Sequence, residues 1–304
     1  MENTSRWSRI KVFWNRPNHV AYLFILPSLI ALLLFAFVPV VIGLGMSFFD
    51  VNIFFNGTKF VGLHNFIRFF SDTRAINSIW HTVYFTVLET PLQVLVGVLC
   101  AAALSRNTRF NKFCRSTFYI PVVCSLTAIG LVFNMLLDPN IGWFPHLLTR
   151  IGMTAPDFFG NAHWAMPTIA FLTVWKSFGV TMIIMLTAVQ AISPSLYESA
   201  EMDGASRAQQ FFHVTIPQCI PALGFCVLTN LTGSMQVFDQ IFVTTGGGPN
   251  FKTESAVQYI YSRGFSAPYE LGYASTVATI LFVIIAVLAV GSNLYMSHKE
   301  QQMR

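Results

Sequence analysis

The stretch SPSLYESAEMDGASRAQQFFHVTIP, residues 193–217, decides how the rest of this chain is interpreted. We expect Ser195 to cap a short helix whose first turn holds Glu198, because the dipole at the start of a helix favours a carboxylate. Gly204 permits a sharp turn, and a second short helix is expected from about Ser206. The segment therefore predicts two short polar helices, acidic on the first limb. An apolar face is expected on the second, formed by Ala208, Phe211 and Phe212.

The apolar runs that flank this segment are typical of a membrane protein. Of the 304 residues, 54% are hydrophobic and 10% are charged, whereas a soluble domain carries about a quarter charged residues. About 20 apolar residues are enough to cross a hydrocarbon core that is about 30 Å thick. We predict an all-α integral membrane protein with six transmembrane helices, at about 20–48, 79–104, 114–137, 165–192, 218–243 and 271–297.

The distribution of Lys and Arg predicts the orientation, because cytoplasmic flanks retain these residues. With the amino terminus inside, eleven of them fall on the inner side and six fall in longer outer loops. Both termini and the 193–217 segment are therefore assigned to the cytoplasm. The first apolar run, 20–48, exceeds the length of a cleavable signal, and we expect it to stay attached as a membrane helix.

Several chemistries are not indicated by the sequence. It has no G-x-x-x-x-G-K-[ST] motif, so we expect no ATP hydrolysis by this chain alone. Its seven histidines and five cysteines show no metal-ligand spacing, and no catalytic nucleophile and base can be assigned. The net charge of +5 is attributed to residues that flank the membrane, not to binding of nucleic acid.

Residues 193–217 resemble a motif of a known family. Glu198-Ser199-Ala200, then Gly204, then Val214-Thr215-Ile216-Pro217 follow the order of the EAA loop of binding-protein-dependent ABC importers, with small departures at Ser199, Val214 and Ile216. Four further stretches resemble the carbohydrate-uptake permeases of the type I fold. They are Phe60-Val61-Gly62-Leu63-His64-Asn65-Phe66, Trp175-Lys176, Thr245-Gly246-Gly247-Gly248-Pro249 and Gly272-Tyr273-Ala274-Ser275.

This resemblance implies a multi-pass subunit of a prokaryotic inner membrane that imports a sugar, such as an oligosaccharide, or a related polyol or glycerol phosphate, by alternating access. It implies a second permease subunit, two cytoplasmic ATPase subunits that bind the ATP and Mg, an extracytoplasmic binding protein and surrounding lipid. The implied type I permease domain covers 75–297, with a first transmembrane helix at 20–48 and cytoplasmic tails at 1–19 and 298–304. The coupling loop, 193–217, would contact the ATPase through Glu198, Ala200, Asp203 and Gly204.

The resemblance also implies where a substrate would pass. In the family, residues of the two spans that flank the EAA loop contact the sugar. Counting from Glu198 and Gly204 without gaps gives the corresponding positions here, and they fall on one face of each span. The alternative role for the same residues is helix packing. Lys176 is also a candidate partner for Glu89 or for another subunit, and it favours an anion such as glycerol phosphate over a neutral sugar. Asp239 is expected to cap or pair. The eight pathway candidates are Thr173, Lys176, Ser177, Val180, Asn230, Gly233, Ser234 and Val237.

Two other classes of protein were weighed. An ion-coupled secondary transporter also uses broken helices and charges near the midplane, but no inverted repeat is visible here, and such a carrier has no use for a loop that docks an ATPase. A membrane-embedded enzyme would need a convergent set of catalytic residues.

Overall fold

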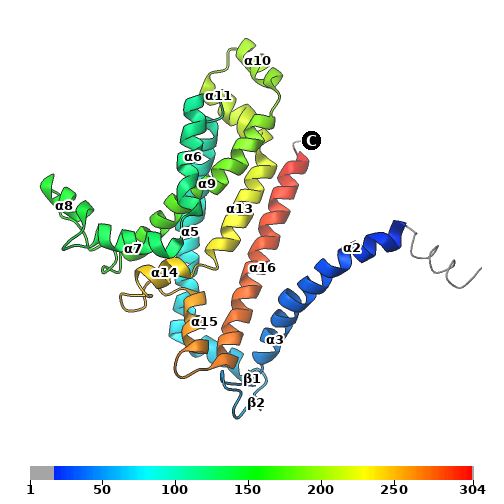
Figure 1. Ribbon diagram of the computed structural model, residues 1–304, viewed down its shortest axis with the longest axis vertical. Helices are drawn as coiled ribbons and strands as arrows, with labels where there is room; N and C mark the ends of the chain where they lie inside the picture. Colours follow the sequence, from blue (N-terminus) through cyan, green and yellow to red (C-terminus); the bar gives the residue numbers. More distant parts are fainter. Residues whose placement is uncertain (1–16, 303–304) are drawn as a thin grey trace, which may run out of the picture.

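The computed structural model describes residues 17–302, which are almost entirely α-helical. Four helices form the centre of the molecule and lie side by side in Figure 1. Two short segments cap opposite ends of this bundle. We call the end that carries α10 (Pro194–Met202) and α11 (Arg207–Gln210) the α10 end. The opposite end, with α4 (His64–Ser71) and α15 (Ala256–Phe265), is the α15 end. The central helices are α5 (Thr73–Ala103), α9 (Ala165–Ala191), α13 (Ile220–Ser234) and α16 (Leu271–Gln302).

Within residues 17–302, four stretches are long and apolar enough to cross a membrane as single spans. They are Phe24–Met46, Thr73–Ala103, Ala165–Ala191 and Leu271–Lys299. The number rises to six if each of two bent helix pairs is one span, which agrees with the predicted spans. The final helix α16 continues to Gln302, five residues past the predicted end at 297, so part of the predicted tail 298–304 is helical.

The third predicted span, 114–137, is a bent pair. Helix α6 (Arg109–Val123) and helix α7 (Leu126–Leu137) meet at 96°. Cys124 and Ser125 between them have extended backbone, with ψ of 148° and 128°. Apolar composition alone did not reveal this break. Helix α8 (Trp143–Arg150) follows and projects away from the bundle in Figure 1.

The fifth predicted span, 218–243, also differs from expectation. Its helix α13 ends at Ser234, and the chain then turns through residues 235–238 into the six-residue helix α14 (Asp239–Thr244). At its other end, α13 bends by 72° from the helical stretch Arg207–Gln218. That stretch comprises α11, the π-helical turn η2 (Phe211–Thr215) and α12 (Ile216–Gln218).

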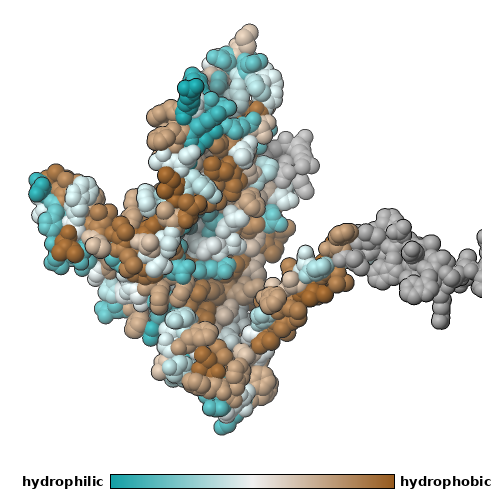
Figure 2. All heavy atoms as spheres, in the orientation of Figure 1, coloured by the Kyte–Doolittle hydropathy of each residue, from teal (hydrophilic) through white to brown (hydrophobic). Residues whose placement is uncertain are grey.

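The first span contacts α16 through its C-terminal part and diverges from the bundle towards its N-terminal part (Figure 1). It comprises α2 (Pro17–Leu32), a π-helical turn η1 (Leu33–Phe37) and α3 (Val38–Met46). Pro39 has no N–H to donate to Phe35, so the wider turn at this point has a direct cause. None of the most apolar window of Phe24–Met46 is buried, and Figure 2 shows its hydrophobic surface. An apolar surface of this size is stable only against lipid or another protein chain.

The bundle is held by close contact between α5 and α9. A Cβ added at Gly97 would lie 2.6 Å from Thr181 Cγ2, so the two helices can approach this closely only with glycine at that position. Buried apolar residues of α5, α9 and α13 surround this contact, among them Val98, Ala101, Met182, Met185 and Cys226.

The α15 end is tied to the bundle by the backbone of a small hairpin. Strands β1 (Phe49–Asp50) and β2 (Lys59–Phe60) pair antiparallel. The buried side chain of Asn65 donates to the carbonyls of Ser47 and Phe49. Gly272 is essential for the approach of α16, because a Cβ there would lie 2.0 Å from the Phe49 oxygen. Two of the stretches that carried the resemblance, 60–66 and 272–275, thus meet in one structural contact.

Candidate functional site

The segment 193–217 forms two short helices at the α10 end, as predicted. Ser193, not Ser195, occupies the N-cap position, and Pro194 begins α10, where a proline needs no hydrogen-bond partner. Gly204 has a φ of +77°, which supplies the expected sharp turn. Ser206 and Gln209 then form a capping box that starts α11.

The acidic limb of this segment is solvent-exposed and unpaired. Glu198, Glu201 and Asp203 are exposed, and α10 has no buried residue. No ion pair involves these carboxylates within residues 17–302. Figure 2 shows hydrophilic atoms gathered over this end of the molecule. Such a limb offers negative charge to a partner without first having to break an internal bond.

The second limb is anchored to the bundle. The Tyr197 hydroxyl and the Thr215 hydroxyl are 2.9 Å apart, which ties the two limbs together. Phe211 packs against the core, but Phe212 and Ala208 are exposed, so only one of the three residues of the predicted apolar face is packed. A cleft of about 700 Å³ lies beside the helices, and the guanidinium-bearing residues Arg106 and Arg207 are among those that line it.

A second feature is a polar cavity of about 300 Å³ between α5, α9 and α13. Seven of the eight pathway candidates line it, so the structure brings the two predicted helix faces together. These seven are Thr173, Ser177, Val180, Asn230, Gly233, Ser234 and Val237. Five further residues complete the lining: Phe85, Glu89, Gln93, Thr229 and Gln240.

Lys176 is the pathway candidate that does not line the cavity. Its ammonium group donates to the carbonyl oxygen of Val122 at 3.1 Å. This carbonyl belongs to the last turn of α6, where the break before α7 leaves it without a helical donor. Lys176 therefore stabilises a helix end. Within the described residues it forms no ion pair with Glu89, which was one of its predicted roles.

The cavity wall is a chain of hydrogen bonds between helices. The Thr90 hydroxyl lies 3.1 Å from Glu89 Oε2 and 3.0 Å from the Ser234 hydroxyl. In a second series of hydrogen bonds, the Gln93 amide donates to Asn230 Oδ1, and the Asn230 amide donates to the Thr181 hydroxyl at 3.1 Å. Gln93 Oε1 is buried and has no partner.

Sequence reasoning missed the contribution of α5 to this cavity. Phe85, Glu89 and Gln93 are spaced at four-residue intervals, so they share one face of a helix. Glu89 is an isolated acid within a predicted span, and the four-residue spacing around it was the feature of the sequence that could have predicted this third wall. The pathway residues were predicted by counting from Glu198 and Gly204 in the 193–217 segment. This procedure covered only the two spans that flank the segment, and α5 is not one of them. Asp239 begins α14 with its side chain exposed.

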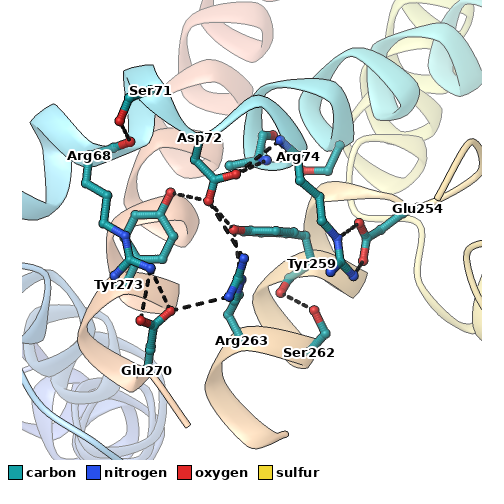
Figure 3. Close-up of polar contacts among 12 residues, drawn as sticks. Arg68, Ser71, Asp72, Arg74, Glu254, Tyr259, Ser262, Arg263, Glu270 and Tyr273 are labelled. Carbon is teal, nitrogen blue, oxygen red and sulfur yellow. Dashed lines mark hydrogen bonds and ion pairs between the residues drawn. The ribbon is translucent and has the colours of Figure 1, made fainter. Parts of the chain in front are cut away.

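The α15 end carries a dense set of charges (Figure 3). Asp72 accepts hydrogen bonds from the hydroxyls of Tyr259 and Tyr273 and lies 4.0 Å from Arg263. Glu270 pairs with Arg68 at 2.9 Å and with Arg263 at 3.6 Å. This network connects α4, the start of α5, α15 and α16.

The electrostatics of this network follow from its hydrogen bonds. Burial alone would raise the pKa of Asp72, but the bonds from Tyr259, the Ala75 N–H and Tyr273, together with Arg263, hold that pKa below 3.8. Burial, reinforced by the bond to Asp72, raises the pKa of Tyr259 to about 12. Asp72 is therefore an anion and Tyr259 a neutral donor at neutral pH.

Comparison with known proteins identifies relatives over nearly the whole chain. The sequence profile of the family described as "Binding-protein-dependent transport system inner membrane component" matches residues 93–299. The chain is 32% identical over 279 residues to the probable ABC transporter permease protein YurN of Bacillus subtilis (strain 168), covering 90% of this chain and 95% of that relative. It is 28% identical to the multiple sugar-binding transport system permease protein MsmF of Streptococcus mutans serotype c (strain ATCC 700610 / UA159), covering 88% and 91%.

A solved structure shares the fold. A chain of a bacterial ABC transporter involved in the import of the acidic polysaccharide alginate superposes with a TM-score of 0.81 at 24% identity, covering 96% of this chain and 98% of that one.

Proposed function

The chain belongs to the family of binding-protein-dependent transport system inner membrane components, as an ABC transporter permease, and we propose that it forms half of the membrane pathway of an ATP-driven sugar importer. One observation carries the proposal. The polar cavity of about 300 Å³ lies where α5, α9 and α13 meet, and hydroxyl and amide groups line it. Ser, Thr, Asn and Gln side chains both donate and accept hydrogen bonds, as sugar hydroxyls do.

Names of relatives support a sugar as substrate. They include transport systems for multiple sugars, for starch degradation products and for arabinooligosaccharides. Related names also include an sn-glycerol-3-phosphate system. In the sequence, Lys176 was the one feature that favoured an anion, and its ammonium group donates to Val122 instead of lining the cavity. We assign the remaining seven candidates to the substrate pathway.

Coupling to ATP hydrolysis is assigned to the α10 end. Glu198, Ala200, Asp203 and Gly204 form the exposed limb and its turn, and we place them in contact with a separate ATPase subunit. The unpaired carboxylates support this role because they are available for charge-assisted bonds to a partner. ATP and Mg are bound by that partner, and this chain is the non-enzymatic transport subunit.

The complete importer contains further subunits. We infer a second permease subunit beside this one, two ATPase subunits at the α10 end and a substrate-binding protein at the α15 end. The extended and unburied first span supports contact with another chain or with lipid. A related solved structure is that of a bacterial alginate ABC transporter in complex with a periplasmic protein that holds alginate pentasaccharide.

The orientation in the inner membrane follows from charge. Arg106, Arg109, Arg115, Arg207 and Lys299 belong to segments that meet at the α10 end in Figure 1. Cytoplasmic flanks retain such residues, so we place the α10 end and both termini in the cytoplasm. The permease core is assigned to 75–297, and membership in an ABC transporter family replaces the ion-coupled alternative.

The test is to fill the cavity without disturbing the helices. Ser177 makes no hydrogen bond within the described residues, and a Cβ at Gly233 would meet no atom within 4 Å. Ser177→Phe and Gly233→Leu are therefore expected to assemble normally and to abolish ATP-dependent sugar uptake in proteoliposomes that contain the whole importer. Ser116→Phe, at an exposed position of α6, is the matched control and should transport at the wild-type rate. Normal uptake by both cavity variants would place the pathway elsewhere.

A further inference from the structure

The polar cavity contains a single ionisable side chain. Of its twelve lining residues, Glu89 alone is ionisable, and neither Lys, Arg nor His lines the wall. Glu89 is 3% exposed and its bond from the Thr90 hydroxyl is 3.1 Å long. No ion pair involves Glu89 anywhere in residues 17–302. An acid in a membrane span is costly, so its presence without a cation needs a functional explanation.

The cation that could have balanced Glu89 is bound elsewhere. Lys176 adjoins the lining residue Ser177 in sequence, yet it donates to the Val122 carbonyl at the end of α6. The bend of 96° between α6 and α7 exposes that carbonyl, and a lysine bonded to it is not available to a substrate. The break in the third span therefore leaves the cavity without a cation, because Lys176 is bound at the end of α6.

The one buried polar atom of the cavity that lacks a partner among the described residues, Gln93 Oε1, is an acceptor. The Gln93 amide nitrogen is used by Asn230, which leaves the buried Gln93 Oε1 without a donor. The Glu89 carboxylate can accept more than the one bond from Thr90. A ligand rich in hydroxyl groups would supply the missing donors. An anion would bring further acceptors and leave its own charge unpaired in a desolvated site.

We propose that Glu89 sets the charge selectivity of the pathway, which accepts neutral, hydroxyl-rich sugars and rejects substrates that carry phosphate, sulfonate or carboxylate groups. The inference rests on the proposed function of the cavity and makes its substrate class specific. In its ionised form, Glu89 accepts bonds from sugar hydroxyls and repels anions.

The charge of the cavity can be measured without knowing the natural sugar. Ser177→Cys is introduced into the complete importer on a background in which the five native cysteines are replaced. The reaction rates of the cationic thiol reagent MTSET and the anionic reagent MTSES are measured at pH 8 and normalised to a free thiol. The normalised ratio should favour MTSET about tenfold, and Glu89→Gln should remove that preference, because Glu89 and position 177 line the same cavity, where one charge interacts about this strongly.

A matched substitution separates local from general charge. Asp50→Asn removes one exposed carboxylate at the β hairpin, remote from the cavity, and should leave the ratio unchanged within about twofold. The proposal is overturned if Glu89→Gln leaves the ratio as it was. It is equally overturned if Ser177→Cys reacts with neither reagent in both the nucleotide-free and the ATP-bound complex.

Protection from MTSET tests the substrate class on the same complex. Raffinose, maltotriose and glycerol 3-phosphate are the probes, and at least one neutral sugar should slow the reaction while glycerol 3-phosphate should not. Protection by glycerol 3-phosphate, or by neither sugar, contradicts the assignment of a neutral substrate. The proposed function fails separately, when Ser177→Phe and Gly233→Leu leave ATP-dependent uptake intact.

Discussion

Charged side chains are paired at one end of this molecule, and acidic side chains are exposed and unpaired at the other. At the α15 end, acids and bases from four helices are joined to one another, and Glu254 is 3% exposed in a pair with Arg74 at 2.7 Å. At the α10 end, Glu198, Glu201 and Asp203 are exposed and have no ion-pair partner within residues 17–302. The four ion pairs Arg68–Glu270, Arg74–Glu254, Arg263–Asp72 and Arg263–Glu270 all lie at the α15 end.

This difference separates charges that stabilise the fold of a membrane subunit from charges that are available to a partner protein. A buried pair is costly to form and more costly to break, so it fixes how helices are arranged. An exposed and unpaired acid contributes little to stability and is available to another protein. We therefore expect substitutions at the α15 end to lower stability, and substitutions at the α10 end to impair transport in a stable protein.

The largest effect is expected at the α10 end. Glu198→Lys replaces a charge-assisted contact with repulsion, and a lost contact of about 1.5–3 kcal/mol corresponds to a roughly 10–100-fold loss of sugar uptake. The melting temperature in detergent should be unchanged. Asp50→Lys makes the same charge reversal at an exposed site of the α15 end and is the control. Wild-type uptake by Glu198→Lys would show that this acid has no coupling role.

The next effect concerns the α15 end. Arg74→Ala removes a two-bond contact to Glu254, at 2.8 and 2.7 Å, and leaves that acid buried without a partner. Breaking a buried pair costs about 3–5 kcal/mol, reduced to about 2–3 kcal/mol because the Arg74 side chain is 35% exposed. Thermal unfolding of the purified complex measures the loss. Arg150→Ala, at an exposed site of α8, should stay within about 0.5 kcal/mol of the wild type, and equal stability of both variants would contradict the comparison.

The pH dependence of stability is a smaller effect at the same end. Because the pKa of Asp72 is held below 3.8 in the folded protein, its contribution is fully present above that ordinary value and is lost as pH falls through the folded pKa. The melting temperature should therefore decrease in acid below about pH 4. Asp72→Asn should decrease less steeply over the same range, since it has no such carboxylate to protonate. Identical slopes would mean that this network does not stabilise the fold.

The smallest effect is expected from shortening one side chain of the cavity wall. Asn230→Ala removes the bonds to Gln93 and Thr181 and should raise the half-saturation concentration for sugar roughly 2–10-fold. The Asn230 side chain already bonds to Gln93 on α5 and to Thr181 on α9. Its main role is therefore to hold the cavity wall in place, and direct binding of the sugar is secondary. Thr232→Ala is the control on the same helix, because that hydroxyl bonds only to backbone carbonyls of α13. A change in both variants would reflect α13 as a whole, and a change in neither would remove Asn230 from the pathway.

Local physical rules predicted much of this structure. The length of the apolar runs predicted α5, α9 and α16, and Gly204 predicted the turn between α10 and α11. The bends at Cys124 and after Ser234 were not predicted, because an apolar run has the same composition whether it is straight or broken. The bond from Lys176 to Val122, made possible by one of these bends, was missed for the same reason.

The cavity shows a similar limit. Spacing predicted that residues of α9, of α13 and of the turn after α13 face one another, and seven of the candidates do line one cavity, because positions one turn apart share a face. It did not reveal α5 as the third wall, since the pairing of spans depends on contacts between helices far apart in the sequence. Gly97 and its close approach to Thr181 became meaningful only when both helices were in place.

The most direct test of the central claim is photo-crosslinking from the two ends of the assembled importer. A benzoylphenylalanine is placed at Ser199 on α10, and separately at the exposed Phe251 of the α15 end. We expect Ser199 to yield an adduct with the cytoplasmic ATPase subunit and Phe251 to yield none, which would also fix the orientation in the membrane. An ATPase adduct from Phe251, or none from Ser199 in a complex that hydrolyses ATP, would contradict the account.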